Sequence, residues 1–568
     1  MRGGRVAQLA RCEAVHKHFN AIYLVASAAW LALLYGPGVN GGFVYDDLPH
    51  IQYNNSLASW SRTFHYFRAG DPFARDLLGG GGTAWRPLMW LTLSLDNHVW
   101  GSNPLAFHIT SLVLHWIGGA FAFRLLIRLE IPQVWAAAAC FLWLGLPINS
   151  EAVAWMSAVS YPLMFCFLCA SLLAADSWLR NGSKLSILLW VLTAAAALMS
   201  NEEGLIALPL AFLLMCFRNS LPRLRCIALV ATGTVVDLVY LTGRWFIRAS
   251  LPAGAPVVSA FGATYVRYLH WMILPVQMSV ERSTSTPSNV SSIERVAGLA
   301  GSLFLVTTIY WLRKKAPAVS HGLAWMFVGL LPFCGIVPIY QGMAERYAYV
   351  ASFGFVVALI AIVCGAGQRA RPIIAGLVLL WALWGAWRLH SRVLDWNDPV
   401  TLFTASLEAT PNSIKLLYNL GTAYELSGRF DEAAGVYQKI LARNGAYEPA
   451  LVGMGDVELA AGNLARAETA YSQATIDNPS DENADCNLGV VLVKEGKTDR
   501  AIQVLRRAIR IGPSDPNAYY DLGAAYQVGG DRTLAVEMYK RALDLKPGDP
   551  QTVANLESLG ATSTSVQR

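Results

Sequence analysis

Two adjacent carboxylates, Asp46 and Asp47, follow the first long apolar segment of the chain closely. Because neighbouring acids repel each other, the pKa of one of them can rise. A carboxylate within hydrogen-bond reach of a substrate hydroxyl can act as a general base. The alternative is structural, since Asp-Asp before Leu-Pro is also typical of a turn or a helix cap.

Further ionisable residues lie where other apolar segments begin. Arg86 follows a run of glycines, and Glu151, Glu202, Glu345 and Arg346 stand at or near the starts of apolar segments. Charged groups at such depths are costly unless they are paired or functional. We therefore predict that Asp46, Arg86, Glu202 and Arg346 share one cleft. An ion pair between Glu345 and Arg346 that only anchors its loop is the alternative for those two residues.

The composition indicates a membrane protein. Of the 568 residues, 54% are hydrophobic and 14% are charged, and the mean hydropathy is +0.39. Apolar stretches fill residues 20–389 and polar residues dominate from 395 onward, which predicts two domains in different solvents. The net charge of +6 comes from short basic clusters between apolar segments, so we expect no nucleic-acid partner. The CxxC of Cys166 and Cys169 lies within an apolar segment, where buried thiols are expected rather than a redox pair.

A spanning helix needs about 20 mostly apolar residues, and the sequence offers eleven candidates. They lie near 20–36, 104–123, 132–147, 152–175, 185–199, 204–217, 226–243, 292–312, 322–340, 348–366 and 372–389. If the spans alternate, one side holds 16 basic residues against three acidic ones. By the positive-inside rule the N-terminus is cytoplasmic and everything after residue 390 lies outside.

A repeat of fixed period fills the last third of the chain. Gly421, Gly455, Gly489 and Gly523 lie 34 residues apart, with small, aromatic and proline residues recurring at constant offsets. This resembles the tetratricopeptide repeat, in which paired helices stack into a solenoid with a concave surface for extended peptides. We expect a half repeat at 402–411 to cap the array. Asn419 and Asn487 are candidates for pairing with a peptide backbone, and solvated helix asparagines are the alternative.

Several motifs occur together in one order along the chain: Phe43-Val-Tyr-Asp-Asp-Leu48, Arg86-Pro-Leu88, Asn103-Pro104 with His108 and His115, Glu151-Ala-Val-Ala-Trp155, Glu202 with Gly204, and Ala344-Glu-Arg-Tyr347. With the repeats, this combination resembles the transmembrane and tetratricopeptide-repeat containing O-mannosyltransferases. The resemblance implies an inverting GT-C type glycosyltransferase that uses a polyprenyl-phosphate sugar and a serine or threonine acceptor. Where that family usually has His-Pro-x-His and a lysine, this sequence has Leu146-Pro147-Ile148-Asn149 and Asn201.

The resemblance points to Asp46 as the base, with Asp47 orienting the acceptor or the base. The leaving phosphate gathers negative charge and requires a guanidinium group. Arg86, Arg244, Arg248 and Arg346 are the candidates, and we expect neither a metal nor a cofactor, the lipid-linked sugar being a substrate.

The predicted fold is all-α: a GT-C-like membrane bundle followed by a tetratricopeptide-repeat solenoid. We place the membrane domain at 1–394, with outer loops at about 37–103 and 245–290, the repeat domain at 395–560 and a disordered tail at 561–568. A bacterial inner membrane is expected before the endoplasmic reticulum. Two rival functions remain: transfer to a glycan or lipid acceptor, and a membrane-anchored scaffold without catalysis.

Overall fold

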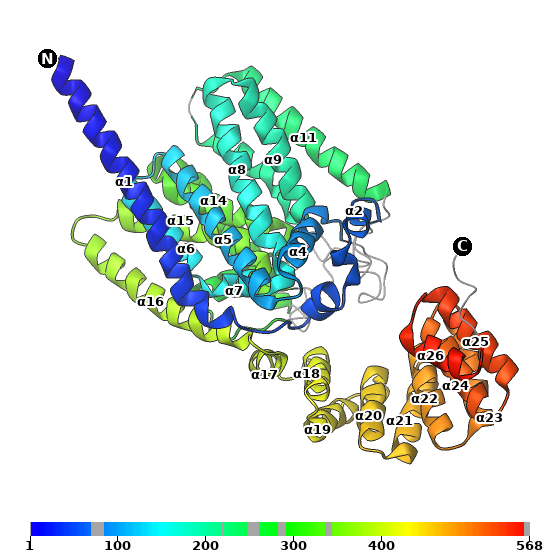
Figure 1. The fold of residues 1–568 in the computed structure, drawn as a ribbon. Helices are drawn as coiled ribbons and strands as arrows, with labels where there is room; N and C mark the ends of the chain where they lie inside the picture. The colour runs from blue at the N-terminus through cyan, green and yellow to red at the C-terminus, as the bar shows by residue number, and fades with distance from the viewer. Residues whose placement is uncertain are drawn as a thin grey trace. The chain divides into compact units, whose positions relative to one another are not determined.

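The protein is described by a computed structural model that places residues 2–69, 84–218, 220–246, 261–281, 291–334 and 343–561. These residues form helices and no strand. They divide into two compact units, Met1–Ser413 and Ile414–Arg568, which are described separately (Figure 1). The predicted all-α class is confirmed.

Among the described residues of the first unit, seven helices are long and apolar enough to cross a membrane. They include α1 (Arg2–Tyr35), which passes this test over His18–Gly38 together with the turn that follows it. The other six are α5 (Pro104–Arg128), α8 (Ser160–Asn181), α11 (Arg223–Phe246), α13 (Ser292–Lys315), α15 (Tyr349–Gly365) and α16 (Arg371–Asp395).

The remaining predicted spans are helical but shorter or broken. The chain bends by 56° between α6 (Gln133–Leu144) and the segment Pro147–Ala154, which contains α7 (Ser150–Ala154). Three further helices have 10 to 17 residues each: α9 (Lys184–Ser200), α10 (Ala207–Cys216) and α14 (Pro317–Leu330). All eleven predicted segments are therefore helical where the structure describes them, and four of them are not single long spans.

The helices differ in how much of their surface is covered by protein. Within the apolar windows of α13 and α16 only 11% and 17% of residues are buried, against 83% in the window that includes α8. Helices whose apolar side chains remain uncovered need an apolar solvent. We conclude that α8 belongs to the centre of the unit, whereas α13 and α16 present their side chains to lipid.

The centre of the unit is a cluster of aromatic rings. Trp143 of α6 stacks on Phe165 of α8 at 4.5 Å between ring centroids and meets the ring of Tyr349 of α15 edge-on at 5.2 Å. Its indole nitrogen donates to the hydroxyl of Ser352, and the ring of His115 bonds the Tyr349 hydroxyl at 2.6 Å. The polar atoms of this core are thus paired internally, as burial requires.

Short helices occupy the segments predicted as outer loops. α2 (Trp60–Ala69) and α4 (Pro87–Trp100) lie in the first, and α12 (Phe261–Ile273) lies in the second. Residues 70–83, 247–260 and 282–290 of these two loops, and residues 562–568 of the predicted tail, lie outside the described residues.

The second unit has the predicted paired helices. They are α18 (Ile414–Leu426) with α19 (Phe430–Leu441), α20 (Glu448–Ala460) with α21 (Leu464–Asp477), α22 (Glu482–Lys494) with α23 (Thr498–Ile511), and α24 (Pro516–Val528) with α25 (Arg532–Leu545). A Cβ added to Gly421 would approach the ring of Tyr437 to 2.5 Å, and one added to Gly489 would approach Leu505 equally closely. The repeating glycine is therefore the place where two helices touch.

The ends of the array differ from the prediction. A further helix, α26 (Pro550–Ser558), follows the fourth pair and buries Leu556 against the array. The expected N-terminal half repeat is α17 (Pro399–Ala409), but it belongs to the first unit. The division falls after Ser413 instead of residue 394, because hydroxyl groups of α17 and of the turn after it bond residues 279–281 of the membrane unit.

Candidate active site

Asp47 is fully buried, and both oxygens of its carboxylate accept hydrogen bonds from protein groups. One oxygen accepts hydrogen bonds from the backbone nitrogen of Ser157 at 2.7 Å and from its hydroxyl at 2.6 Å, and the other accepts from the nitrogen of Val44 at 3.3 Å. Burial outweighs these bonds and raises the pKa of Asp47 to about 7. This residue ties the loop that carries it to the segment between α7 and α8.

Asp46 has the opposite surroundings. Its side chain is half-buried, and among the described residues no group forms a hydrogen bond or ion pair with its carboxylate. Its backbone oxygen accepts from the nitrogen of His50 at 3.0 Å, which fixes the main chain. The two adjacent acids thus divide into a held carboxylate and an available one.

Backbone strain accompanies this arrangement. Tyr45, directly before the two acids, has a φ of 54°, in the left-handed region that residues with a side chain rarely adopt. Its ring lies 5.5 Å from that of Trp155 and 5.9 Å from that of Phe403. Strained conformations persist where the surrounding packing imposes them, and they gather at functional sites.

Glu151 and Arg346 form a buried ion pair across 195 residues of sequence. The guanidinium donates to one oxygen of Glu151, and the backbone nitrogen of Arg346 donates to the other at 3.0 Å. The guanidinium also lies over the rings of Trp155 and Tyr347, at 5.1 and 4.9 Å from their centroids. Arg346 is therefore fully engaged by protein groups.

Glu345 does not pair with its neighbour. It is 1% exposed, and its carboxylate accepts from the backbone nitrogen of Ser279 at 2.7 Å. The alternative of an ion pair between Glu345 and Arg346 is therefore wrong, because the two side chains bond opposite segments of the unit.

Glu202 lies between two arginines. It accepts from Arg86 at 2.7 Å and from Arg244 at 2.8 Å, one through each carboxylate oxygen. Burial raises its pKa, but the two guanidinium groups outweigh burial and hold the pKa at about 2. The side chains of Arg86 and Glu202 keep 28% and 23% of their exposure. Two cations therefore share one anion at a place that a ligand can reach.

Electrostatic interactions connect these groups into one cluster. Tyr45 interacts with Asp46 and with Arg346, and Tyr161 interacts with Arg346 and with Arg86. Asp46, Arg346, Arg86 and Glu202 therefore lie in one neighbourhood, although a cavity common to all four stays a prediction. Arg248 lies outside the described residues.

Sequence reasoning missed three residues of this neighbourhood. Ser157 and Tyr161 are ordinary in an apolar segment and carry no signal of their own. Glu203 is 3% exposed, both of its carboxylate oxygens lack a hydrogen-bond partner among the described residues, and burial raises its pKa well above the usual range. Its place beside Glu202 in the sequence was the available clue.

The departures from the family motifs are structural here. Asn149 donates to the backbone oxygen of Trp143 at 2.9 Å and accepts from Ser352 at 3.0 Å. Asn201 donates to the hydroxyl of Ser160 and accepts from the nitrogen of Glu203. Among the described residues, no group of three or more His, Cys, Asp or Glu side chains is arranged to hold a metal ion.

The candidate asparagines of the second unit have different surroundings. The amide nitrogen of Asn487 reaches Asp456 at 3.4 Å, and that of Asn419 is buried without a partner in the described chain. Asp456 also accepts from the hydroxyl of Tyr471, and burial raises its pKa. Burial raises the pKa of Asp521 of α24 to about 7.

Family models match the second unit of the chain. Models of the tetratricopeptide repeat match residues 416–446, 452–516 and 492–558. A solved structure of MamA is 27% identical to this chain, covers 26% of it and 86% of MamA, and has a TM-score of 0.24.

Curated relatives match the membrane unit as well. A protein O-mannosyl-transferase of Caenorhabditis elegans is 23% identical, covering 72% of this chain and 61% of its own length. One of Drosophila melanogaster is 24% identical, covering 74% and 61%. The chain thus spans about 61% of the length of these relatives. With its repeats, and with matches to these curated relatives over 72% and 74% of its length, the chain is similar to the transmembrane and tetratricopeptide-repeat containing O-mannosyltransferases.

Proposed function

We propose that the protein transfers mannose from a polyprenyl-phosphate carrier to serine or threonine hydroxyls of proteins, on the non-cytoplasmic face of its membrane. The names of its curated relatives support mannosyl transfer to protein. The observation that carries the proposal is the pair of adjacent acids: Asp47 is held by Ser157, whereas Asp46 is reachable and has no protein partner in the described chain.

In this proposal the acceptor oxygen attacks C1 of the sugar while Asp46 takes its proton. A bond forms between that oxygen and C1, the bond from C1 to the phosphate oxygen breaks, and the electron pair leaves with the lipid phosphate. Attack from the face opposite the leaving group inverts the configuration at C1. Asp47 positions the loop and does not touch the substrate, because its carboxylate accepts hydrogen bonds from Ser157 and Val44 within the described chain.

The phosphate is assigned to Arg86 and Arg244. Together with Glu202 they hold one positive charge in excess, and partial burial makes that charge more effective than it would be in water. Arg346 was a candidate for the same task, but Glu151 already neutralises it. We give Arg346 a positioning role, because it holds the start of α15 against α7.

The repeat unit is proposed to bind the acceptor polypeptide, as repeat solenoids bind extended chains along their concave surface. With the N-terminus in the cytoplasm, this unit would lie on the same outer side as Asp46. A reporter enzyme fused after residue 568 tests the topology, because activity restricted to the cytoplasm would place the repeats on the wrong side for the acceptor.

The function is tested with the purified full chain, a polyprenyl-phosphate mannose donor and a peptide rich in serine and threonine. We expect mass spectrometry to find one hexose added to a hydroxyl, and Asp46→Asn to abolish the addition. Transfer to a glycan or a lipid but to no peptide would favour the first rival. Absence of any transfer, combined with normal partner binding by Asp46→Asn in cells, would favour the scaffold.

A further inference from the structure

A cavity of about 520 Å³ lies far from the cluster around Asp46. It is lined by the end of α5, the start of α6, the end of α10, the start of α14 and the end of α15. α15 begins just after Arg346, and its last residues line the cavity. At 1.5 Å per residue its 17 residues put about 25 Å between the two places. The cavity therefore belongs to the other end of the membrane unit.

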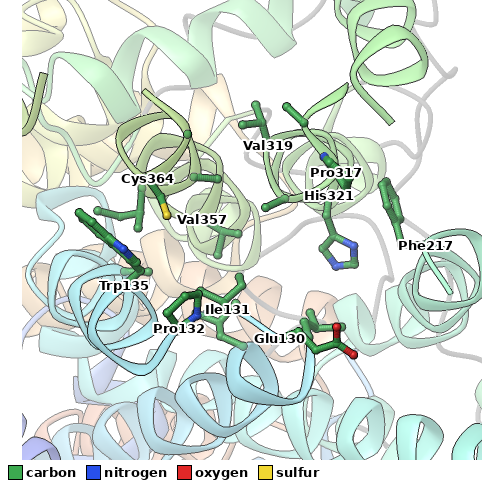
Figure 2. A pocket seen from close by; sticks show the side chains of 18 of the residues that line it. Glu130, Ile131, Pro132, Trp135, Phe217, Pro317, Val319, His321, Val357 and Cys364 are labelled. Atoms are coloured by element: carbon green, nitrogen blue, oxygen red, sulfur yellow. The ribbon is translucent and has the colours of Figure 1, made fainter. Parts of the chain in front are cut away.

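The cavity is apolar on one side and polar on the other. Trp135, Val357 and Ile360 form part of the apolar wall, whereas Glu130 and His321 belong to the polar side. Figure 2 shows the His321 ring pointing from α14 into the cavity, with Glu130 and Phe217 on either side. His321 is 7% exposed, and its Nε2 atom has no hydrogen-bond partner in the described part of the chain. A buried ring nitrogen without a partner costs free energy unless a ligand meets it.

The apolar side continues into a second cavity of about 380 Å³ between α1, α6, α15 and α16. The two cavities share Trp135 and Ile360, so they lie side by side, with these two side chains between or along them. The lining of the second includes Trp30, Phe141 and Val378 and is almost entirely hydrocarbon. This shape suits a long apolar chain whose polar end stays beside His321.

Positive charge surrounds the polar end. Arg218 and Lys315 line the cavity, and Arg128, Arg313 and Lys314 lie at the same helix ends. Arg218 is engaged by Asp176 and lies 3.6 Å from Glu130, and Lys315 lies over the ring of Trp311 at 3.8 Å. Lys315 has no acid partner in the described chain, so its charge is available to an anion. Basic residues at a membrane edge attract the phosphates of anionic lipids.

We propose that the two cavities hold one anionic phospholipid of the surrounding bilayer. Its phosphate meets Lys315 and the Nε2 atom of His321, and one acyl chain passes Trp135 and Ile360 into the second cavity. The site lies about 25 Å of helix away from the reacting groups, so it does not depend on the proposed sugar transfer. The bound phospholipid would fill the space between α5, α6, α14 and α15 at the end of the membrane unit where the cavity lies.

The test uses the full chain in nanodiscs of phosphatidylcholine with or without phosphatidylglycerol, followed by mild detergent extraction and native mass spectrometry. We expect one phosphatidylglycerol to stay bound per chain and no phosphatidylcholine to replace it. Lys315→Gln and His321→Phe should each weaken retention about tenfold, because each removes one charged or charge-assisted contact to phosphate. Ala361→Phe, which fills the cavity, should abolish retention.

Lys314→Gln is the matched control, because it removes the same charge from the neighbouring residue, which does not line the cavity. Equal loss from Lys314→Gln and Lys315→Gln would mean general attraction to the basic edge and would overturn the proposal. Equal retention of phosphatidylcholine would overturn it as well. If Ala361→Phe fails to fold, the two exposed lysine variants still decide the question, and soluble glycerol phosphate that displaces the lipid would show that only the headgroup binds.

Discussion

Two groups of charged residues lie close together in the membrane unit, and they differ in what remains available. In the first group, Asp46, Arg86 and Arg244 are partly exposed, and the cations outnumber the acid that binds them. In the second group, Asp47 and the pair of Glu151 with Arg346 are buried and satisfied by protein. We call them the open group and the closed group. The comparison teaches that the presence of a charged residue does not by itself identify a substrate contact. The residue must also have a charge or a hydrogen-bonding atom that other protein groups do not already neutralise or bond.

The largest expected effect is on catalysis in the open group. Asp46→Asn should lower kcat by on the order of 10² to 10⁴, because the amide keeps the shape of the carboxylate but cannot take a proton. Donor binding and the thermal midpoint of unfolding should stay unchanged, since the Asp46 carboxylate has no hydrogen-bond or ion-pair partner among the described residues. Single-turnover mannosyl transfer is the measurement. Near wild-type turnover in this variant, with loss in Asp47→Asn, would exchange the roles of the two acids.

The next effect is on stability in the closed group. Glu151→Gln leaves the Arg346 guanidinium buried without a counter-charge, which costs about 3 to 5 kcal/mol of unfolding free energy. Denaturant unfolding in detergent measures it. The double variant Glu151→Gln with Arg346→Met should recover much of the loss, because no unpaired charge remains. Unchanged stability of Glu151→Gln would show that the ion pair of Glu151 with Arg346 does not stabilise the fold.

A smaller effect is expected on donor affinity. Arg244→Gln removes one of the two guanidinium groups beside Glu202, so the apparent KM for the lipid-linked donor should rise about tenfold. Stability should change by less than about 1 kcal/mol, as for other partly exposed ion pairs. Arg223→Gln, at the opposite end of the same helix α11, is the control. A loss of kcat without a change in KM would argue against phosphate binding here.

The last expected effect is a change in pH dependence. The pKa of Asp47 is about 7 in the folded protein and near 3.9 in an unfolded chain. Between these values the folded state holds a proton that the unfolded state releases, so stability falls as pH rises towards 7, by at most about 1.4 kcal/mol per pH unit. Asp47→Asn should lack this slope when thermal midpoints are compared from pH 5 to 8. Parallel curves for both proteins would contradict the assignment.

The individual members of the open group could be proposed from the sequence, because each is a charged residue next to an apolar segment. Charged residues at the starts of apolar segments are costly, so Asp46, Arg86 and Glu202 were recognisable one by one. The repeat was equally clear, since a period of 34 residues places glycine wherever two helices touch. Class, repeats and candidate residues are therefore local properties that a sequence displays.

Pairing was beyond the sequence. Glu151 and Arg346 are 195 residues apart, and Arg346 has an acid directly beside it that turns out to bond elsewhere. Ser157 holds Asp47 through its hydroxyl and through its backbone nitrogen, and every residue except proline possesses the second of these groups. The lengths of α9, α10 and α14 likewise depend on the neighbours that cover them. These contacts form between segments that are distant in the sequence, so no single segment predicts them.

The segment 279–281 has a consequence for exchanging modules between relatives. Its residues bond Glu345 on one side and Ser406, Thr410 and Ser413 on the other. A chimaera joined at residue 395 would replace Ser406, Thr410 and Ser413 with residues of another protein. The bonds to residues 279–281 would then change beside the contact of Ser279 with Glu345. A junction after Ser413 would replace the repeat array while the recipient protein keeps α17 and every one of these bonds. Such a chimaera would test the acceptor binding proposed for the array with an intact membrane unit.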